Sequence, residues 1–590
     1  MNDILKTQRS FARKADNHKE HRFDDLYHLI CREDWLWTAL QHVLSNKGAK
    51  TPGVDGISKE DLKTEEQQAE FIESLRTDLK SGTYQPMPVK RQWIDKPGKD
   101  EKRGLGIPTI RDRVVQELLR MLMEPIWESD FLDCSHGFRP GRRTMDCIYF
   151  FYSRVHRSNR YYIAIEGNIR KCFDRVNHKI LLKLIRRRIA DPRIVKLVKA
   201  QLKAGLMDGA LFHDTPEGTP QGGILSPLLA NIYLHELDMW WWRKFGSLEP
   251  KDKKRRRRHK QGNAILVRYA DDFVMLWNGT RQAAFTLRDE LKQFLWEELH
   301  LELSEERTKV TYLTDGIDFL GFHIQLMFPR DNKPWLRVSP TQANLKRFKA
   351  KIKRLTRRNT TFATVEMKFK SLNRIIRGWG NYYRHVSFKH DAGELDYWLN
   401  RRILIWLKHK HQGKGIKWIL DRYKVREITG KYNRWNFGVQ DSQNGQMVHI
   451  AKLSDISLTR YKRAKPPNPY LTTVDIPNII EAETPLLDER LLNVTPEGVA
   501  WREMRKRVLQ RDEYRCAECG KNNLPLNVHH VVARRDGGTD EMSNLITLCA
   551  NCHIDTPNFG RPQTGRKFLR RAGCVERRTS GSEGRARETR

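Results

Sequence analysis

The segment VRYADDFVML, residues 267–276, places two adjacent carboxylates between apolar runs of strand-like composition. Ionised carboxylates in a half-buried strand are costly unless a partner neutralises them, and a metal ion is a partner that two acids can share. Asp271 and Asp272 therefore indicate either a divalent-cation site or a surface Asp-Asp turn, which is the commoner origin of an isolated pair. The rest of the sequence has to decide between these two interpretations.

Length and charge narrow the class of protein. A chain of 590 residues is too long for one hydrophobic core and predicts about three or four domains. It contains 109 Lys and Arg against 72 Asp and Glu, which gives a formal net charge of +37. An excess of this size along most of the chain predicts a polyanionic partner such as nucleic acid.

A membrane partner is not expected. No stretch approaches about 18 consecutive apolar residues, and the N-terminus MNDILKTQRSFARK lacks the apolar core of a signal peptide. Five of the nine cysteines are scattered, and four form two close pairs near the C-terminus. This pattern favours a metal site in a reducing compartment over a disulfide framework, so we predict an intracellular protein.

The hydrophobic pattern predicts an α+β fold. Residues 111–127 form an expected helix with an apolar face and with Arg and Glu facing away. Short apolar runs at 161–165, 264–268 and 273–277 predict strands among the helices. An Asp-Gly within TYLTDGIDFLGFHI predicts a hairpin turn. The basic run KDKKRRRRHK, residues 251–260, predicts a solvated loop with affinity for phosphate.

From about residue 340 to 440 the chain becomes helical, basic and aromatic. In the stretch NRIIRGWGNYYRH, arginines alternate with aromatic residues. Such a mixture suits contact with phosphates and stacking on bases, although a buried aromatic seam with solvated arginines explains it equally well. The candidate RNA-binding residues are Arg374, Arg377, Trp379, Tyr382, Tyr383 and Arg384.

The carboxylate pair does not stand alone. In chain order, the motifs PGVDGI, LGIPT, HGFRPGR, TPQGGILSPLLANIYL, YADD and FLGFH surround it. In this order they resemble the palm and fingers of a reverse transcriptase, specifically of the maturase family encoded by group II introns. The resemblance runs from about residue 50 to the C-terminal module. It implies a right-hand-like fingers and palm domain followed by an α-helical thumb or maturase domain.

The resemblance assigns roles to individual residues. Asp271 and Asp272 match acids that bind two Mg²⁺ ions, which activate a primer 3′ hydroxyl and stabilise the leaving pyrophosphate. Phe173 matches the aromatic residue that screens the 2′ position of an incoming nucleotide. Cations around the turn of KPGKDEKRGLGIPTIRDR and the glycine-rich turn TPQGG supply the remaining nucleotide-binding candidates, which are Lys96, Arg103 and Gln221.

One position departs from the family pattern. Aligning EGNIRKCFD on Phe173 places Asn168 where the family carries a metal-binding aspartate. An amide offers one oxygen and no charge, so the Mg²⁺ pair loses one of its main anionic anchors. Polymerisation is then expected to slow by about 10² to 10⁴-fold. Glu166, on the same face if the strand persists that far, is an alternative source of a carboxylate, and Asp174 is more plausibly structural.

Two cysteine pairs define a module near the C-terminus. Cys516 and Cys519 form one C-x2-C pair, and Cys549 and Cys552 form another after 29 intervening residues. Four thiolates at this spacing predict a tetrahedral Zn²⁺ site that stabilises a module otherwise short of core. A bare structural zinc knuckle would account for the cysteines alone.

The residues within and after this spacing resemble an HNH endonuclease. That resemblance implies a small ββα fold holding one catalytic Mg²⁺ or Mn²⁺ ion, with Zn²⁺ as the structural ion. His530 matches the general base that activates water, a role that suits imidazole. His529 and His553 match ligands of the catalytic metal, and Asn544 matches the asparagine that fixes the loop carrying the base.

The expected organisation has six parts. They are an N-terminal extension with the start of the fingers at 1–90, fingers and palm at 91–335, a helical thumb or maturase domain at 336–440, a DNA-binding region and linker at 441–494, an HNH endonuclease at 495–560, and a basic, disordered tail at 561–590. The linker is placed at 465–489 because that stretch is rich in proline and acid.

The resemblance implies a protein that binds group II intron RNA and assists splicing. It would support retrohoming by nicking target DNA and copying RNA from the nicked end with dNTPs. Such a protein is expected in a bacterial-type cytoplasm, associated with the nucleoid when bound to DNA. Asn168 predicts an impaired polymerase in this chain. The alternatives are a fully active reverse transcriptase in which nearby acids compensate, and a stand-alone HNH nuclease with a basic scaffold.

Overall fold

The structure is a computed structural model. It describes residues 2–95, 102–155, 159–209, 211–219, 222–328, 334–428, 433–443, 445–461, 468–471, 504–505, 507–522, 526–532, 539, 541–549 and 552. The chain divides into two compact units. The larger comprises Met1–Thr311, Ile317–Ile324 and Val338–Thr484, and the smaller comprises Tyr312–Gly316, Gln325–Arg337 and Pro485–Arg590.

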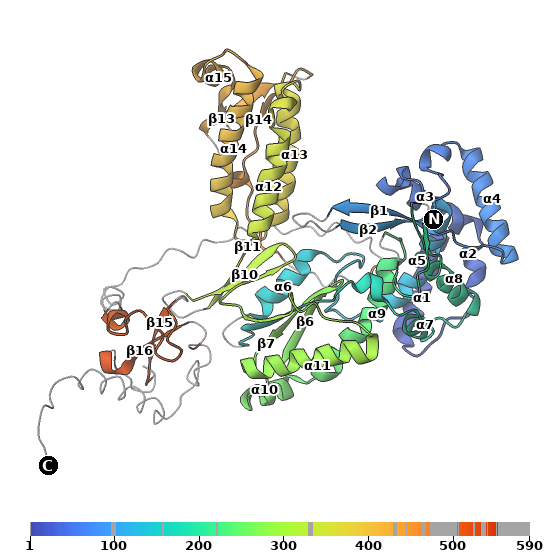
Figure 1. Ribbon diagram of the computed structural model, residues 1–590, viewed down its shortest axis with the longest axis horizontal. Helices are drawn as coiled ribbons and strands as arrows, with labels where there is room; N and C mark the ends of the chain where they lie inside the picture. Colours follow the sequence, from blue (N-terminus) through green and yellow to red (C-terminus); the bar gives the residue numbers. More distant parts are fainter. Residues whose placement is uncertain are drawn as a thin grey trace, which may run out of the picture. The chain divides into compact units, whose positions relative to one another are not determined.

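Helix α5 (Ile110–Glu128) lies at the centre of the N-terminal part of the larger unit. Helices α1 (Asn2–Asn17), α2 (Tyr27–Ile30) and α3 (Glu33–Ser45) pack against it (Figure 1). Helix α4 (Glu65–Ser81) packs in turn on α3. The helix predicted at 111–127 is therefore confirmed.

The charged residues of α5 do not face away from the core, so that part of the expectation is wrong. Arg113 and Glu117 are 7% and 4% exposed. Arg113 donates three hydrogen bonds of 2.8–2.9 Å to backbone carbonyls. Glu117 and Glu124 both form ion pairs with Arg120. Buried charges are tolerated when they are paired and hydrogen-bonded, and these contacts let α5 be buried on nearly all sides.

A four-stranded sheet of order β2-β1-β4-β5 lies beside these helices. Strand β1 (Val89–Asp95) is antiparallel to β2 (Lys102–Ile107) and parallel to β4 (Leu206–Asp208). Strand β4 is antiparallel to β5 (Leu211–His213). Between β2 and β4 in sequence, α5 is followed by the helices α6 (Thr144–Arg154), α7 (His178–Ile185) and α8 (Pro192–Leu202).

The sheet that carries the carboxylate pair has the order β6-β7-β3-β8. The three predicted strands are confirmed, as β3 (Ile163–Asn168), β6 (Ala264–Tyr269) and β7 (Asp272–Trp277), and β8 (Lys309–Tyr312) completes the sheet. Successive residues are buried along these strands, so both faces of the sheet are covered, which explains the continuous apolar runs. Helices α6, α9 (Ser226–Trp241) and α11 (Arg281–Leu299) pack against it (Figure 1).

The basic run at 251–260 is not the expected loop. Residues Pro250–Arg258 form helix α10, which follows a π-helical turn at Trp242–Gly246. Proline suits the first position of a helix, where its missing N–H would have no partner. Four arginines occupy the last turn, where the negative end of the helix dipole favours cations.

The hairpin predicted at 311–324 turns at a different place. The Asp-Gly sequence separates β8 from β9 (Ile317–Phe319), and β9 pairs with β10 (Phe322–Met327). The tight turn falls on Leu320 and Gly321, which both have positive φ. The turn between paired strands therefore lies in FLGF, whereas the Asp-Gly, whose Gly316 also has a positive φ, only connects β8 to β9. Strand β11 (Trp335–Pro340) follows.

The helical region expected from 340 to 440 ends at Tyr423. Its helices are α12 (Gln342–Leu355), α13 (Val365–Tyr383), α14 (Lys389–Lys410) and α15 (Ile416–Tyr423), as Figure 1 shows. A small antiparallel sheet follows, formed by β12 (Lys424–Ile428), β13 (Asn433–Gln440) and β14 (Met447–His449). It packs on α13 and α15.

The beginning of the predicted linker is attached to the larger unit. The Tyr470 hydroxyl donates to Glu124 of α5, and Asn468 donates to Ser129 at 3.1 Å. Further upstream, Tyr461 donates to Asp146 of α6 at 2.8 Å. These hydrogen bonds hold the described residues of this stretch against α5 and α6.

The smaller unit contains a short hairpin in which β15 (Leu526–His530) pairs antiparallel with β16 (Leu545–Cys549). The described residues around this hairpin include two small buried clusters. One consists of Val508, Leu509, Val528 and Leu545, and the other of Cys516, Leu548 and Cys549. So little apolar burial is a weak basis for independent stability, and modules of this size usually need a metal or disulfides.

A helix needs about 20 predominantly apolar residues to cross a bilayer. Among the residues that the structure describes, no helix has this combination of length and apolar character.

Candidate catalytic and metal centres

The two carboxylates lie at the turn between β6 and β7. Asp271 is in the turn and Asp272 is the first residue of β7, where it pairs with Asn168 of β3. The side-chain amide of Asn168 donates a short hydrogen bond to Oδ1 of Asp272. Asp271 lies near the buried thiol of Cys172, whose pKa is raised by burial and then by the Asp271 charge. The strand register thus brings the three sequence-predicted palm residues together.

A buried arginine holds this turn in place. Arg268 is fully buried and donates to Oδ1 and Oδ2 of Asp238 at 2.7 and 2.5 Å. It also donates to the Ala270 carbonyl at 3.0 Å, where φ is +57°, and to side chains of Asn231 and Ser135. Burial would raise the pKa of Asp238, but the charge of Arg268 outweighs it and lowers that pKa. The ion pair therefore fixes the backbone beside Asp271.

Sequence reasoning missed Arg268 and Asp238. A signal was present, since Arg268 is the only charge in the apolar run AILVRY and Asp238 ends the largely apolar helical segment NIYLHELD. Buried charges are rarely left unpaired, so two such charges of opposite sign predict each other.

We expect the Arg268→Lys variant to be less stable by about 2 kcal/mol, because lysine keeps the charge but cannot reproduce the five-donor fork. Denaturant unfolding measures the change. The matched control is Arg288→Lys on the surface of α11, whose ion pair with Asp289 is partly exposed and whose loss should cost less than about 0.5 kcal/mol. Equal midpoints for the two variants would contradict the role of Arg268.

Two glycines allow close backbone contacts between sequence motifs, one of them at the turn. A Cβ on Gly137, in HGFRPGR, would lie 2.4 Å from the backbone nitrogen of Ala270. A Cβ on Gly222, in TPQGG, would lie 2.5 Å from the carbonyl oxygen of Gly106, in LGIPT. Both distances are too short for any side chain, so Gly137 is required for close backbone packing beside the carboxylate turn and Gly222 for close packing against LGIPT. HGFRPGR is also less open than its charge indicated, since Arg139 is buried and paired with Glu128 at 2.9 Å.

The nucleotide-binding candidates are only partly described. Phe173 is half-buried in a short 3₁₀ helix, where its ring meets Phe138 edge-on at 6.2 Å. The backbone of Arg103 lies opposite Ile94 in the β1–β2 pair, and the structure does not describe the Arg103 side chain. Lys96 and Gln221 lie outside the described residues.

Two further acids, Glu166 and Asp174, lie on β3 and in the 3₁₀ helix that follows it. Glu166 is half-buried, accepts a 2.8 Å hydrogen bond from the Thr311 hydroxyl, and has a pKa raised by burial. Asp174 is exposed in the 3₁₀ helix beside Phe173. Within the described ranges, the only group of three or more His, Cys, Asp or Glu close enough to hold an ion is the cysteine cluster. The palm residues thus offer two carboxylates and an amide, which is a poor fit to a pair of Mg²⁺ ions.

The cysteine cluster fits Zn²⁺. The sulfur atoms of Cys516, Cys519, Cys549 and Cys552 all lie within 4.8 Å of one another, and Sγ of Cys519 is 3.7 Å from Sγ of Cys549. Zn–S bonds of about 2.3 Å in a tetrahedron place sulfur atoms about 3.8 Å apart. Their surroundings include the buried Leu548, so a metal here would tie the β16 end to the turn at Cys516.

The HNH candidates lie on and after β15. His529 and His530 are its last residues, both half-buried, and burial followed by the charge of His530 lowers the pKa of His529 to about 4. Asn544 donates to the carbonyls of Val532 and Thr539 at 3.0 and 2.8 Å, and accepts from the Val532 N–H at 2.8 Å. It therefore fixes the loop that follows His530. His553 lies outside the described residues.

The candidate RNA-binding residues divide into two groups. Arg374, Arg377 and Tyr382 are exposed on α13, and Arg384, just after it, is partly exposed. Tyr383 is 2% exposed and donates to the Gly321 carbonyl at 3.2 Å. Trp379 packs on Tyr383, Phe348 and Phe388. Tyr383 and most of Trp379 belong to a buried aromatic seam, which was the alternative interpretation of this stretch. The arginines and Tyr382 remain accessible to solvent.

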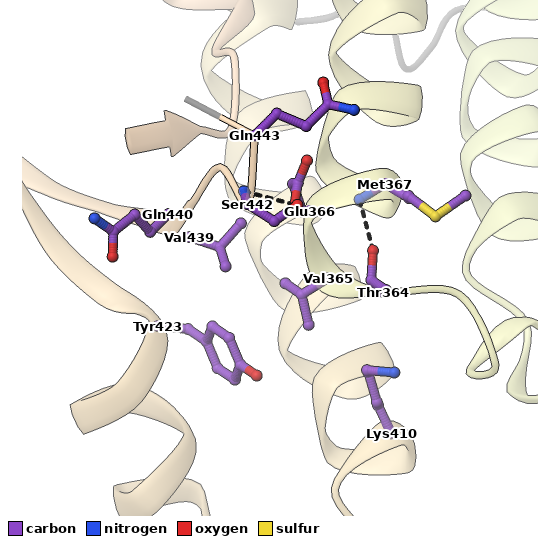
Figure 2. Close-up of a pocket in the computed structure, with 10 residues that line it drawn as sticks. All are labelled: Thr364, Val365, Glu366, Met367, Lys410, Tyr423, Val439, Gln440, Ser442 and Gln443. Atoms are coloured by element: carbon purple, nitrogen blue, oxygen red, sulfur yellow. Dashed lines mark hydrogen bonds between the residues drawn. The ribbon is translucent and has the colours of Figure 1, made fainter. Parts of the chain in front are cut away.

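A separate pocket of about 560 Å³ lies at the other end of α13 (Figure 2). Figure 2 shows Glu366 accepting hydrogen bonds from Ser442, and Thr364 capping the helix through the Met367 N–H. Lys370 also donates to Glu366, and with Ser442 it lowers the pKa of Glu366 to about 2. The lining residues are Thr364, Val365, Glu366, Met367, Lys410, Tyr423, Val439, Gln440, Ser442 and Gln443, so none of the sequence-predicted residues lines it.

Three protein families match this chain in sequence order. Reverse transcriptase (RNA-dependent DNA polymerase) matches residues 94–324, the group II intron maturase-specific domain matches residues 345–424, and HNH endonuclease matches residues 516–557. The first match contains the β6–β7 turn, the second contains most of α12 to α15, and the third contains the four cysteines.

Several curated proteins are similar to this chain. Protein YkfC of Escherichia coli (strain K12) is 39% identical over 340 residues, which cover 54% of this chain and 88% of that protein. Group II intron-encoded protein LtrA of Lactococcus lactis subsp. cremoris is 29% identical over 627 residues, which cover 92% of this chain and 97% of that protein. The chain therefore belongs to the family of group II intron-encoded reverse transcriptases and maturases, and it carries a C-terminal HNH endonuclease domain.

Proposed function

We propose that this chain acts chiefly as an RNA-binding splicing cofactor and DNA-nicking protein of a group II intron, with a polymerase impaired at Asn168. The observation that carries the proposal is the pairing of Asn168 with Asp272 across β3 and β7. The six-part domain division, with boundaries near residues 90, 335, 440, 494 and 560, belongs to the same proposal.

The impairment follows from charge and geometry. Mg²⁺ ions, when bound, would supply charge stabilisation at the primer hydroxyl and the departing pyrophosphate. Asp271 and Asp272 would hold them, but the Asn168 amide donates its N–H toward Asp272 and adds no negative charge. The amide therefore occupies Oδ1 of Asp272, and it does not supply the carboxylate that the family pattern has at position 168. Compensation by Glu166 is disfavoured, because Thr311 already binds its carboxylate.

RNA binding does not depend on that carboxylate. The exposed Arg374 and Arg377 on α13 would contact phosphates, and Tyr382, a residue that is 41% exposed and stacked on Phe322, would offer its outer ring face to a base. Trp379 and Tyr383 would support this face from inside the aromatic cluster. Binding of this kind would help intron RNA reach its splicing-active fold, while the chemistry of splicing stays with the RNA.

DNA nicking would use the β15–β16 module. His530 would take a proton from water, with His529 and His553 holding Mg²⁺ or Mn²⁺. The Asn544 hydrogen bonds to the loop after β15 would keep the His530 backbone in register. A nick that leaves a 3′ hydroxyl on target DNA would then provide a primer for reverse transcription with dNTPs during retrohoming.

We expect the His530→Ala variant to nick target DNA at least about 10²-fold more slowly, since general-base catalysis typically contributes that much. A supercoiled-plasmid nicking assay with the intron ribonucleoprotein measures the rate. His409→Ala, which changes a histidine in the last turn of α14, is the control and should nick normally. Normal nicking by His530→Ala would refute the assignment of the base.

The splicing role is tested by purifying the protein from cells and sequencing the RNA that co-purifies. A defined intron should be enriched, and its splicing in vitro should require the protein. DNA cutting by the purified protein without any RNA, together with no enriched intron, would instead support the stand-alone nuclease.

A further inference from the structure

Helix α10 presents a cationic face that the polymerase, maturase and nuclease sites do not use. Four of its basic side chains are exposed, and they recur at positions i, i+3, i+4 and i+7 of the helix. That spacing puts them on one side, one above another. We call this surface the α10 face: it consists of Lys251, Lys254, Arg255 and Arg258.

The opposite side of α10 is fixed to the palm. Lys253 donates to the Gly246 carbonyl at 3.1 Å, and Arg256 donates to the Gly262 carbonyl at 3.1 Å while its guanidinium lies over the ring of Phe245. Asn263, which is 2% exposed, donates to the Lys253 carbonyl at 2.9 Å. These contacts orient the helix, so the α10 face is a built surface of the folded chain rather than a set of cations on a loose loop.

The charge of the α10 face is hardly compensated within the protein. The four members lie three or four residues apart and all carry positive charge, so they repel one another and would destabilise an isolated helix. Asp252 pairs with Arg255 at 3.3 Å, and among the described residues no carboxylate is within ion-pair distance of the other three members. Glu249 lies before the helix, while Arg154 brings a further cation near Lys253. A folded surface with this much unpaired positive charge is suited to an external polyanion.

We propose that the α10 face binds the phosphate backbone of structured intron RNA, an inference that rests on the proposed RNA-binding function. The four members are two Lys and two Arg, the cations that most often bind phosphate oxygens, and the α10 face has no aromatic ring for stacking. The helix has no apolar residue after Pro250 to enter a lipid surface. From the first to the last member, seven helical steps rise by about 10 Å, a compact strip that suits closely spaced phosphates beside the narrow groove of A-form RNA.

The test is the salt dependence of binding by the full-length protein. The variant Lys251→Gln, Lys254→Gln, Arg255→Gln, Arg258→Gln keeps good helix formers and removes the charge of the α10 face. The control carries the same change of charge at four exposed lysines of α7 and α8, as Lys179→Gln, Lys183→Gln, Lys196→Gln, Lys199→Gln. The probes are a long hairpin RNA and a DNA duplex of the same sequence, and melting curves establish that all proteins are folded.

Loss of four phosphate contacts should reduce the slope of log affinity against log salt by about 3, and affinity at low salt by at least about tenfold. The control should bind like the parent chain, and the loss on RNA should be at least as large as that on DNA. An α10 variant indistinguishable from the parent, an equal loss in the control, or a larger loss on DNA would overturn the inference. If the parent chain itself fails to bind RNA, the proposed function fails with it.

Discussion

The Asn168→Asp variant should extend a primer about 10² to 10⁴-fold faster than the parent chain. A carboxylate at this position would face Asp272 across β3 and β7 and provide the third negative group for the metal ions. Restoring roughly 3 to 5 kcal/mol of transition-state stabilisation gives a rate change of this size. Single-turnover extension of an RNA-templated DNA primer, at saturating Mg²⁺ and dNTPs, measures the chemical step.

The same substitution should leave other functions unchanged. RNA affinity should stay within about twofold, because Asn168 lies on the palm sheet and not on the basic surface of α13. Three adjacent carboxylates repel one another without metal, so the Mg²⁺ dependence of the variant should become steeper while its melting temperature falls slightly.

Glu166→Gln in the parent chain tests the competing explanation. If Glu166 served as the substitute ligand, its loss would abolish the remaining extension activity. We expect no change, because the Thr311 hydroxyl engages its carboxylate and burial raises its pKa. A fall of tenfold or more in Glu166→Gln, together with no gain in Asn168→Asp, would assign the catalytic carboxylate to Glu166 and refute the impairment.

Strands β3, β6 and β7 could be predicted from the sequence because their short runs are continuously apolar and the turn between β6 and β7 is marked by charge. The juxtaposition of Asn168 with Asp272 followed from the resemblance, and the observed register bears it out. The ion pair between Arg268 and Asp238 was not found, since it joins a strand to a helix 30 residues earlier. Periodicity reports local faces and carries no information about such distant partners.

The sequence-based predictions of local structure that were wrong also failed because distant contacts decide the conformation. The run at 251–260 has too few apolar residues to show a helical period, so its helix is specified by tertiary anchors such as Asn263 and by the C-terminal dipole. The hairpin was placed on Asp315-Gly316 because that pair has the stronger turn propensity, but β-sheet pairing selects the turn at Leu320 and Gly321. In α13, alternation of Arg with aromatic residues did not distinguish the exposed Tyr382 from the buried Tyr383, which differ by one position on the helix.

The cysteine site is the feature that spacing alone predicted best. The sequence gives two pairs of thiolates, and the β15–β16 hairpin brings the pairs together. The two small apolar clusters around it contribute little burial. Metal binding should therefore supply much of the folding free energy of this module, on the order of 10 kcal/mol as in other small zinc modules.

Removing Zn²⁺ should consequently unfold the C-terminal module and leave the larger unit folded. A strong chelator, or the Cys519→Ser variant, should lower the zinc content from one ion per chain towards zero and abolish DNA nicking. Cys519 is exposed, so its replacement disturbs no packing and isolates its role as a ligand. Hydrogen exchange should report loss of protection in β15 and β16 but not in α5 or α9.

Cys31→Ser provides the matched control, since Cys31 is a partly buried cysteine of the larger unit that lies outside the cluster. This variant should retain zinc, nicking and protection of β15 and β16. RNA affinity should persist in Cys519→Ser, because the candidate RNA-binding residues belong to α13 and the segment after it. A Cys519→Ser protein that keeps its zinc and nicks DNA at the parent rate would show that the four thiolates are not a structural zinc site, and the stability of the module would then have to come from its apolar clusters alone.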